Sequence, residues 1–214
     1  MTLYDVSVVT RVGTPEWPGD TPFSCGWSAR IADGSSVNLT TITSSPHVGT
    51  HADAPLHVRD NAPAADALPL DAFIGPALVL DIGGEPREID AELAARVPAG
   101  TTRLLLRTGA TIAAGKFPDD WPALTSSIAS LLVSRGLRLL GVDAPSVDRR
   151  DSKTLEVHHA LFAGGACILE NLDLREVSEG GYELLAAPLR WEGVDAAPVR
   201  AVLRALDASR AERR

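Results

Sequence analysis

Short runs of apolar residues, each bounded by Gly, Pro or Asp, recur along this 214-residue chain. Runs of this length, separated by turn-forming residues, favour β-strands. Several of the runs are continuously apolar, which is typical of strands that are covered on both faces. The pattern predicts seven strands, at residues 3–9, 37–43, 77–82, 103–107, 137–142, 166–169 and 182–190.

Helical periodicity is clearest over residues 122–135, and Gly136 is a natural stop after that segment. A shorter helix is expected over residues 91–97, with Asp90 as its N-cap, and a single helical turn at residues 71–73. Strands and helices do not alternate strictly. The order therefore predicts a mixed fold, α/β or α+β, with a largely central sheet.

No repeat, linker or low-complexity tract divides the chain, so we expect a single domain over residues 1–214. Hydrophobic residues make up 45% and charged residues 22% of the sequence, which is ordinary for a globular protein. The formal net charge of −8 argues against a nucleic-acid partner, because phosphate binding requires clustered Lys and Arg.

The expected location is the cytoplasm. No apolar run reaches the roughly 18–20 residues that a membrane span requires, and the first residues lack the features of a secretion signal. Cys25 and Cys167 lie far apart and form no CxxC motif, which favours a reduced protein. We expect a soluble, cytoplasmic chain without a membrane partner.

All five histidines lie in two short clusters, and each cluster is accompanied by a carboxylate. The first cluster includes Asp53 and the second is followed by Glu170; the histidines are His47, His51 and His57 in the first cluster, and His158 and His159 in the second. Random placement would scatter them. Histidine, aspartate and glutamate together are the ligands that a borderline divalent metal prefers. The pattern predicts a metal-dependent hydrolase.

The first cluster is expected to be a loop. His47 and His51 are four residues apart, but flanking prolines and the intervening Val-Gly-Thr oppose a helix. Gly49 would allow a tight turn after the strand at residues 37–43. Local extension at residues 51–53 would direct two side chains the same way.

Glu170 follows an apolar strand. A buried, unpaired carboxylate costs several kcal/mol, so Glu170 must be paired, neutralised or bound to a metal. An arginine partner is the structural alternative. Because His158 and His159 are adjacent, only one of them could face the site from an extended chain, and the residues alone do not decide which.

The pattern H-x-G-T-H-x-D-x-P-x-H is complete at residues 47–57 and resembles the signature of the cyclase-like metal hydrolases. Within that superfamily the chain is similar to the bacterial kynurenine formamidases, also called arylformamidases. Further segments carry the same resemblance, so that it covers nearly the whole chain: residues 17–23, 141–148, 152–154 and 195–200.

The resemblance implies a role for each matching position. It implies a two-metal zinc site, an acid/base role for His57 and substrate contact by Trp17. The twelve-residue spacing to Glu170 selects His158 rather than His159, and Asp53 and Glu170 would bridge the metals. It further implies a swivelling β/β/α domain and a homodimer. The implied metal ligands are His47, His51, Asp53, His158 and Glu170.

The implied reaction is hydrolysis of N-formyl-L-kynurenine to formate and L-kynurenine, a step in tryptophan degradation. Two carboxylate-bridged metals can hold a hydroxide at neutral pH, and His57 would protonate the departing aryl amine. Two alternatives remain open. One is a sister amide hydrolase resembling the isatin hydrolases, and the other is a non-catalytic metal-binding protein, although its excess of donors argues for an open site.

Some residues have a simpler structural explanation. Trp17 could be a packing residue, and turn chemistry after a strand would explain Asp143 and Asp148. Lys153 could meet a substrate carboxylate, but a solvated loop lysine is the simpler expectation. The sequence has no nucleotide-binding fingerprint and no G-x-S-x-G motif, so it predicts no cofactor other than metal and no serine nucleophile.

Overall fold

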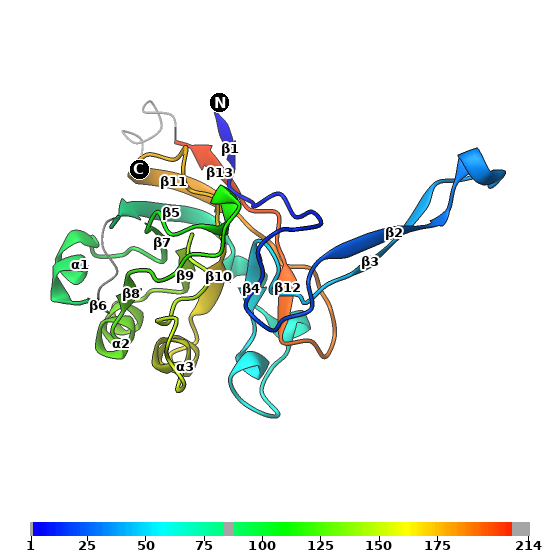
Figure 1. Cartoon of the computed structure of the whole chain (residues 1–214). Coiled ribbons are helices and arrows are strands. Elements are labelled where there is room, and N and C mark those ends of the chain that lie inside the picture. Colours follow the sequence, from blue (N-terminus) through cyan, green and yellow to red (C-terminus); the bar gives the residue numbers. More distant parts are fainter. Residues whose placement is uncertain (1, 84–87, 207–214) are drawn as a thin grey trace.

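A nine-stranded mixed sheet organises the chain in this computed structural model, which describes residues 2–83 and 88–206 (Figure 1). The strand order is β1-β13-β11-β5-β7-β9-β10-β4-β12. The sheet strands are β1 (Leu3–Asp5), β4 (His51–Asp53), β5 (Ile74–Asp81), β7 (Arg103–Arg107), β9 (Leu139–Val142), β10 (Cys167–Glu170), β11 (Gly180–Leu185), β12 (Ala196–Pro198) and β13 (Val202–Ala205).

The four central strands β5, β7, β9 and β10 are parallel, and the flanking pairs are antiparallel. Strands β7 and β9 are buried almost throughout, because both faces of the sheet carry a hydrophobic core. Leu104 and Leu106 belong to the core on one face, whereas Leu105 belongs to the core on the other. This alternation is what the period of two in a strand requires.

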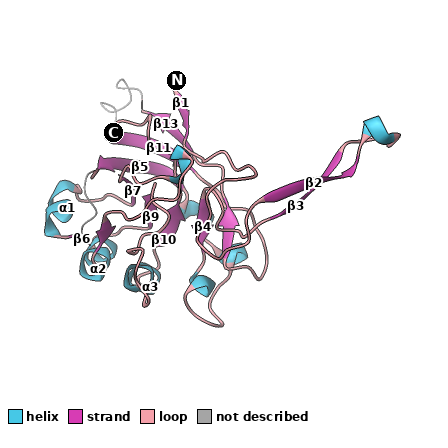
Figure 2. Ribbon diagram, viewed as in Figure 1, coloured by secondary structure: helices cyan, strands magenta, loops and turns pink. Residues whose placement is uncertain are grey.

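Three helices cover one face of the central strands (Figure 2). They are α1 (Ala91–Arg96), α2 (Ser126–Ser134) and α3 (Glu156–Ala163). Asp90 caps α1 by accepting a hydrogen bond from the backbone N–H of Glu92, and Thr125 caps α2 by accepting one from that of Ile128. None of the helices among the described residues has the length and apolar character needed to cross a membrane.

A two-stranded hairpin extends away from the sheet as an arm (Figure 1). It consists of β2 (Ser24–Ala29) and β3 (Leu39–Thr43) and ends in the 3-10 turn Ile31–Asp33. Nearly all of its residues are exposed to solvent. The remaining short elements are β6 (Glu88–Ile89), β8 (Ala123–Leu124) and the 3-10 turns Pro55–His57, Ala65–Ala67, Leu70–Ala72 and Ile112–Ala114.

The predicted mixed α/β fold with a central sheet is confirmed. The strand at residues 103–107 and the helix capped by Asp90 lie where the sequence places them. The other predicted strands are present but shorter or shifted, and the helix predicted from residue 122 begins only after β8 and Thr125. Helix α3 is the main correction, because the segment around His158 was expected to be extended.

Gly141 in β9 should tolerate no side chain. A Cβ at this position would collide with Leu105 and press against Leu172, both of which are fully buried. Overpacking of a dense core costs about 1–3 kcal/mol. Gly141→Ala is therefore expected to lower the free energy of unfolding by that amount, measured by urea denaturation. Gly26→Ala in the arm, where a Cβ meets nothing, is the matched control and should change stability little; equal losses in both variants would contradict the account.

Candidate active site

Strand pairing brings the two histidine clusters together. Strand β4 lies antiparallel to β10, and the register sets His51 opposite Glu170. Asp53 is two residues after His51, so both side chains emerge on the same face of β4. His51 Nε2 lies 3.6 Å from Glu170 Oε2. Residues almost 120 positions apart in sequence thus meet on one face of the sheet.

His47 reaches the same place through a tight turn. Gly49 has a φ of +79°, and a Cβ there would collide with the Thr10 hydroxyl, so this position requires glycine. The turn places His47 Nδ1 at 3.1 Å from His51 Nε2 and at 3.1 Å from Asp53 Oδ1. His51 Nε2 lies 3.2 Å from the same oxygen. The predicted loop with a local extension is what the structure contains.

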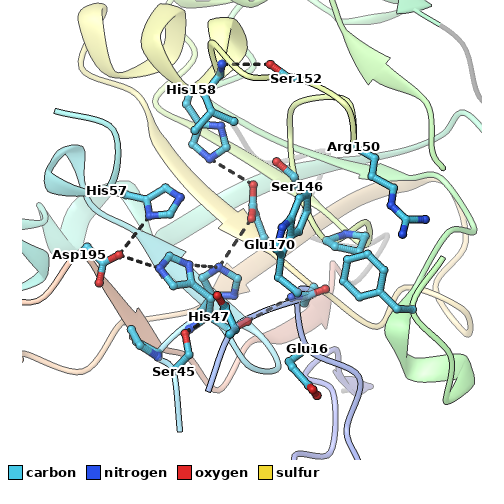
Figure 3. Close-up of a pocket in the computed structure, with 18 of the residues that line it drawn as sticks. Glu16, Ser45, His47, His57, Ser146, Arg150, Ser152, His158, Glu170 and Asp195 are labelled. Atoms are coloured by element: carbon cyan, nitrogen blue, oxygen red, sulfur yellow. Dashed lines mark hydrogen bonds and ion pairs between the residues drawn. The ribbon is translucent and has the colours of Figure 1, made fainter. Parts of the chain in front are cut away.

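A second trio of donor atoms shares Asp53. His158 Nε2 lies 3.3 Å from Asp53 Oδ2 and 3.5 Å from Glu170 Oε1. All three side chains are at least 95% buried. Asp53 therefore contributes one oxygen to each trio. This is the arrangement expected of a carboxylate that bridges two cations. Figure 3 shows the carboxylate of Glu170 beside the ring of His158.

The donor set fits divalent cations. Ligands held about 2.0–2.1 Å from a tetrahedral zinc lie roughly 3.3–3.4 Å from one another, close to the separations in both trios. Asp53 Oδ1 is buried and accepts no hydrogen bond. A cation between the donors would satisfy this oxygen. The trios His47, His51, Asp53 and Asp53, His158, Glu170 could each hold an ion.

The electrostatics of the cluster favour the same conclusion. Burial lowers the pKa of His47, but the neighbouring carboxylates of Asp195 and Asp53 outweigh it and raise this pKa to about 10. Burial also opposes the charged form of His158, whose pKa Asp148 and Asp53 raise to about 10. Burial and the charge of Asp53 raise the pKa of Glu170. The metal-free cluster therefore retains protons, which a divalent cation would replace.

In each of the three histidines of the two trios, the ring nitrogen that does not face the trio contacts an oxygen atom of another residue. His47 Nε2 lies 2.9 Å from Asp195 Oδ2, and His51 Nδ1 lies 2.9 Å from the carbonyl oxygen of Gly49. His158 Nδ1 lies 2.6 Å from Asp148 Oδ2. Such partners set the orientation and tautomer of a metal-binding histidine. The nitrogens that remain are those that face the two trios.

Asp148 has a larger role than turn formation. Besides the His158 ring, its carboxylate accepts hydrogen bonds from the backbone N–H groups of Val157 and His158 in the first turn of α3. It therefore anchors both the helix and the ring. Asp143 does support a loop, as its carboxylate accepts hydrogen bonds from Thr108 and Gly109. The sequence signal for Asp148 was only its place in the resembling segment 141–148.

His57 lies beside the two trios rather than in them. It ends the 3-10 turn Pro55–His57, and its side chain is 30% exposed. Its ring centroid is 4.4 Å from that of His47, and its Nδ1 is 3.1 Å from Asp195 Oδ2. It lines the pocket together with His47 and His158 (Figure 3). Its acid/base role stays a prediction that this position suits.

The choice between the adjacent histidines has a geometric answer. On α3 consecutive side chains point about 100° apart, so only one can face the sheet. His158 is buried against Asp53 and Glu170, whereas His159 is exposed to solvent. The expectation of an extended chain here was wrong, but His158, the histidine that the family spacing selects, does lie in the cluster.

A cavity of about 500 Å³ opens above the cluster. Trp17 and Phe117 form its aromatic wall, with ring centroids 5.5 Å apart and edge-to-face, and the buried Trp121 supports both rings from behind. Trp17 therefore both packs and faces the cavity. Its wider rim carries acidic and basic side chains, namely Glu16, Asp20, Arg150 and Lys153. Arg150 stacks over Phe117 at 5.6 Å.

The fold and this cluster define a mixed α/β protein with a buried His/Asp/Glu centre under an aromatic cavity, and comparison with known proteins identifies its family. The model of the Cyclase family, described as "Putative cyclase", matches residues 4–149, more than half of the chain. The chain belongs to this family. The resemblance inferred from residues 47–57 is thereby confirmed at the level of the family.

Solved structures share the fold over nearly the whole chain. One, described as a "Potential Metal-Dependent Hydrolase With Cyclase Activity", is 26% identical, with a TM-score of 0.79 and coverage of 94% of this chain and 96% of its own. A predicted metal-dependent hydrolase from Bacillus stearothermophilus is 27% identical, with a TM-score of 0.78 and coverage of 94% and 97%. Isatin hydrolase A from Labrenzia aggregata is 23% identical, with a TM-score of 0.78 and coverage of 94% and 93%, and shows similarity of fold.

His158 and His159 form a matched pair for testing the metal centre. His158→Ala removes a donor atom from the second trio, so it is expected to lose at least one zinc ion per chain after loading and dialysis, measured by inductively coupled plasma mass spectrometry. His159→Ala should retain the wild-type content, because its side chain is exposed. A normal content in the first variant together with a loss in the second would contradict this assignment.

Proposed function

We propose that this chain is a metal-dependent hydrolase that cleaves the formamide of N-formyl-L-kynurenine, yielding formate and L-kynurenine in tryptophan degradation. The observation that carries the proposal is one cavity that combines a buried His/Asp/Glu cluster, the half-exposed His57 and an aromatic wall. The metal-dependent hydrolases with which the chain shares its fold support the reaction class.

We further propose zinc as the metal, with two ions per chain. His47, His51 and Asp53 would hold one ion, and Asp53 would share the second with His158 and Glu170. When bound, such ions lower the pKa of coordinated water and polarise a carbonyl oxygen. The excess of oxygen and nitrogen donors, without any cysteine, suits an open catalytic site rather than a closed structural one.

The chain's own residues would move the protons. His57 Nδ1 faces Asp195, so Nε2 is the ring nitrogen left to exchange a proton within the cavity. In this mechanism Nε2 accepts a proton from the attacking water and delivers it to the nitrogen of the departing aryl amine as the C–N bond breaks. Water and the formamide are thereby converted into formate and the amine with no further reactant.

The cavity walls suit a flat substrate that carries both charges. Trp17 and Phe117 offer ring surfaces to an aryl group, worth about 0.5–1.5 kcal/mol for an aromatic pair beyond the area buried. Lys153 lines the cavity and could receive a carboxylate, while Glu16 and Asp20 could receive an ammonium group. Formylkynurenine is a zwitterionic amino acid with an aryl formamide.

A cyclic aryl amide such as isatin is the second candidate. Isatin hydrolases share this fold, although at 21–23% identity the likeness extends to the fold alone. The aromatic wall suits that ring equally well. Isatin is uncharged, however, and would leave the acidic and basic rim without partners, which is why formylkynurenine is preferred.

The two candidates separate in a single assay. Zinc-loaded protein is expected to release kynurenine from N-formyl-L-kynurenine, to turn over isatin much more slowly, and to lose activity on chelation and regain it with zinc. Absorbance follows both substrates. Turnover of isatin alone would discard the formamidase proposal and keep the metal centre. No turnover of either substrate would favour the non-catalytic metal-binding alternative.

We also propose that the chain forms a homodimer through its arm. The register places Cys25 opposite Ile42 and Trp27 opposite Thr40, so one face of the hairpin is largely apolar. Trp27 and Ile42 are 57% and 61% exposed. A two-stranded hairpin is marginally stable alone in water, and exposed apolar patches are typical of association sites. A second copy of the chain is the proposed occupant.

The arm can be tested without touching the active site. Light scattering after size-exclusion chromatography is expected to give twice the mass of one chain for the wild type and a shift toward a single chain for Trp27→Ser combined with Ile42→Thr. Tryptophan is enriched among the interface residues whose truncation weakens binding by more than about 1 kcal/mol. A matched change on the opposite, polar face, Thr41→Ser, should leave the mass unchanged. A monomeric wild type would contradict the proposal.

A further inference from the structure

One oxygen of Asp195 lies between two histidine rings of different purpose. Asp195 Oδ2 is 2.9 Å from Nε2 of His47, a proposed metal ligand, and 3.1 Å from Nδ1 of His57, the proposed acid/base (Figure 3). The carboxylate lines the cavity and comes from a part of the chain 138 residues or more away from both rings.

The backbone holds Asp195 firmly in this place. Its carbonyl oxygen accepts a hydrogen bond from the backbone N–H of Ala54, and the following strand β12 pairs with β4, placing Ala196 opposite Asp53. The carboxylate is therefore fixed relative to the strand that carries His51 and Asp53. An anchored carboxylate can impose an orientation on the rings that contact it.

A carboxylate accepts hydrogen bonds and donates none, so the ring nitrogen that contacts it must carry the hydrogen. For His47 this assigns the hydrogen to Nε2 and leaves the lone pair of Nδ1 directed at His51 and Asp53. For His57 it assigns the hydrogen to Nδ1 and leaves Nε2 able to accept a proton. The tautomer of His57 does not follow from the ring itself, because unconstrained histidine favours a hydrogen on Nε2. For His47, Asp195 holds the tautomer that the ring already favours.

We propose that Asp195 is a positioning residue that sets the tautomers of His47 and His57 together. A single side chain would thereby prepare one ring to bind metal and the other to exchange a proton. The kinetic consequence rests on the proposed function, whereas the effects on metal affinity and on the ring tautomers do not.

The same three side chains could instead be read as a third metal site, since their donor atoms lie close together. Two observations favour hydrogen bonding. Both separations are ordinary hydrogen-bond lengths. An ion between His47 Nε2 and Asp195 would also require His47 to bind cations through both ring nitrogens, because its Nδ1 already belongs to the first trio.

Zinc affinity separates these alternatives. By competition with a chelating dye, Asp195→Ala is expected to bind zinc about 10–100-fold more weakly than the wild type, the usual effect of removing a partner of a metal-binding histidine. His57→Ala should bind zinc normally. The matched control is Asp66→Ala on the nearby 3-10 turn Ala65–Ala67, which should also bind normally. Weak binding by His57→Ala would support the third metal site and overturn the proposal.

The ring tautomers give a direct readout that a merely structural role would not change. In ¹⁵N-histidine spectra of the zinc-loaded wild type, His57 is expected to carry its hydrogen on Nδ1 and His47 on Nε2. In Asp195→Ala the hydrogen of His57 should move to Nε2. Unchanged tautomers in that variant would overturn the proposal. Asp195→Asn, which preserves the side-chain shape, provides a second variant, and it should show the same order of effects with smaller losses.

A double-mutant cycle completes the test. With saturating zinc, Asp195→Ala in the otherwise wild-type protein is expected to lower kcat for the formamide substrate by at least tenfold, with a smaller change in KM. In the His57→Ala background the same substitution should lower kcat much less, because its effect passes through His57. An equal loss in both backgrounds would overturn that link, while the affinity and tautomer results would remain independent of the substrate chosen.

Discussion

Asp53 is a fully buried carboxylate surrounded by histidine rings, and the arrangement of the site depends on neutralising its charge. An isolated buried carboxylate is costly by several kcal/mol unless cations or hydrogen bonds compensate. Here one oxygen faces His47 and His51, and the other faces His158. The surrounding protons meet this requirement in the metal-free protein, and two divalent ions would meet it more completely. Metal binding should therefore also stabilise the fold.

The sheet converts this requirement into a precise geometry. Because β4 lies between β10 and β12, the same three-residue strand aligns His51 with Glu170 on one side and Asp53 with Ala196 on the other. Helix α3 adds His158 from the covering layer, and Asp148 holds both that helix and its ring. Ligands mounted on paired strands and a capped helix keep their positions better than ligands on free loops. Contacts with distant parts of the chain thus hold the signature at residues 47–57 in place.

Much of the fold and of the cluster could be predicted because the signals are local. Apolar runs gave the strand at residues 103–107, and Asp90 marked the start of α1. The density of histidines at residues 47–57 indicated the ligands.

What could not be predicted depends on contacts between distant residues. Asp195 lies 148 positions from His47, and its place in the resembling segment 195–200 does not mark it as a histidine partner. Helix α3 was missed because its apolar pattern is weak, and the segment with the adjacent histidines was considered as extended chain. Of the arm, only the strand at residues 37–43 was predicted, and its partner β2 was not.

The central claim is that Asp53 bridges two divalent ions, each of which is held by its own trio of ligands. X-ray diffraction from zinc-loaded crystals, recorded on both sides of the zinc absorption edge, tests it most directly. The account predicts two anomalous peaks per chain, one enclosed by His47, His51 and Asp53 and one by Asp53, His158 and Glu170. A peak enclosed by His47, His57 and Asp195, or no peak beside Asp53, would contradict it.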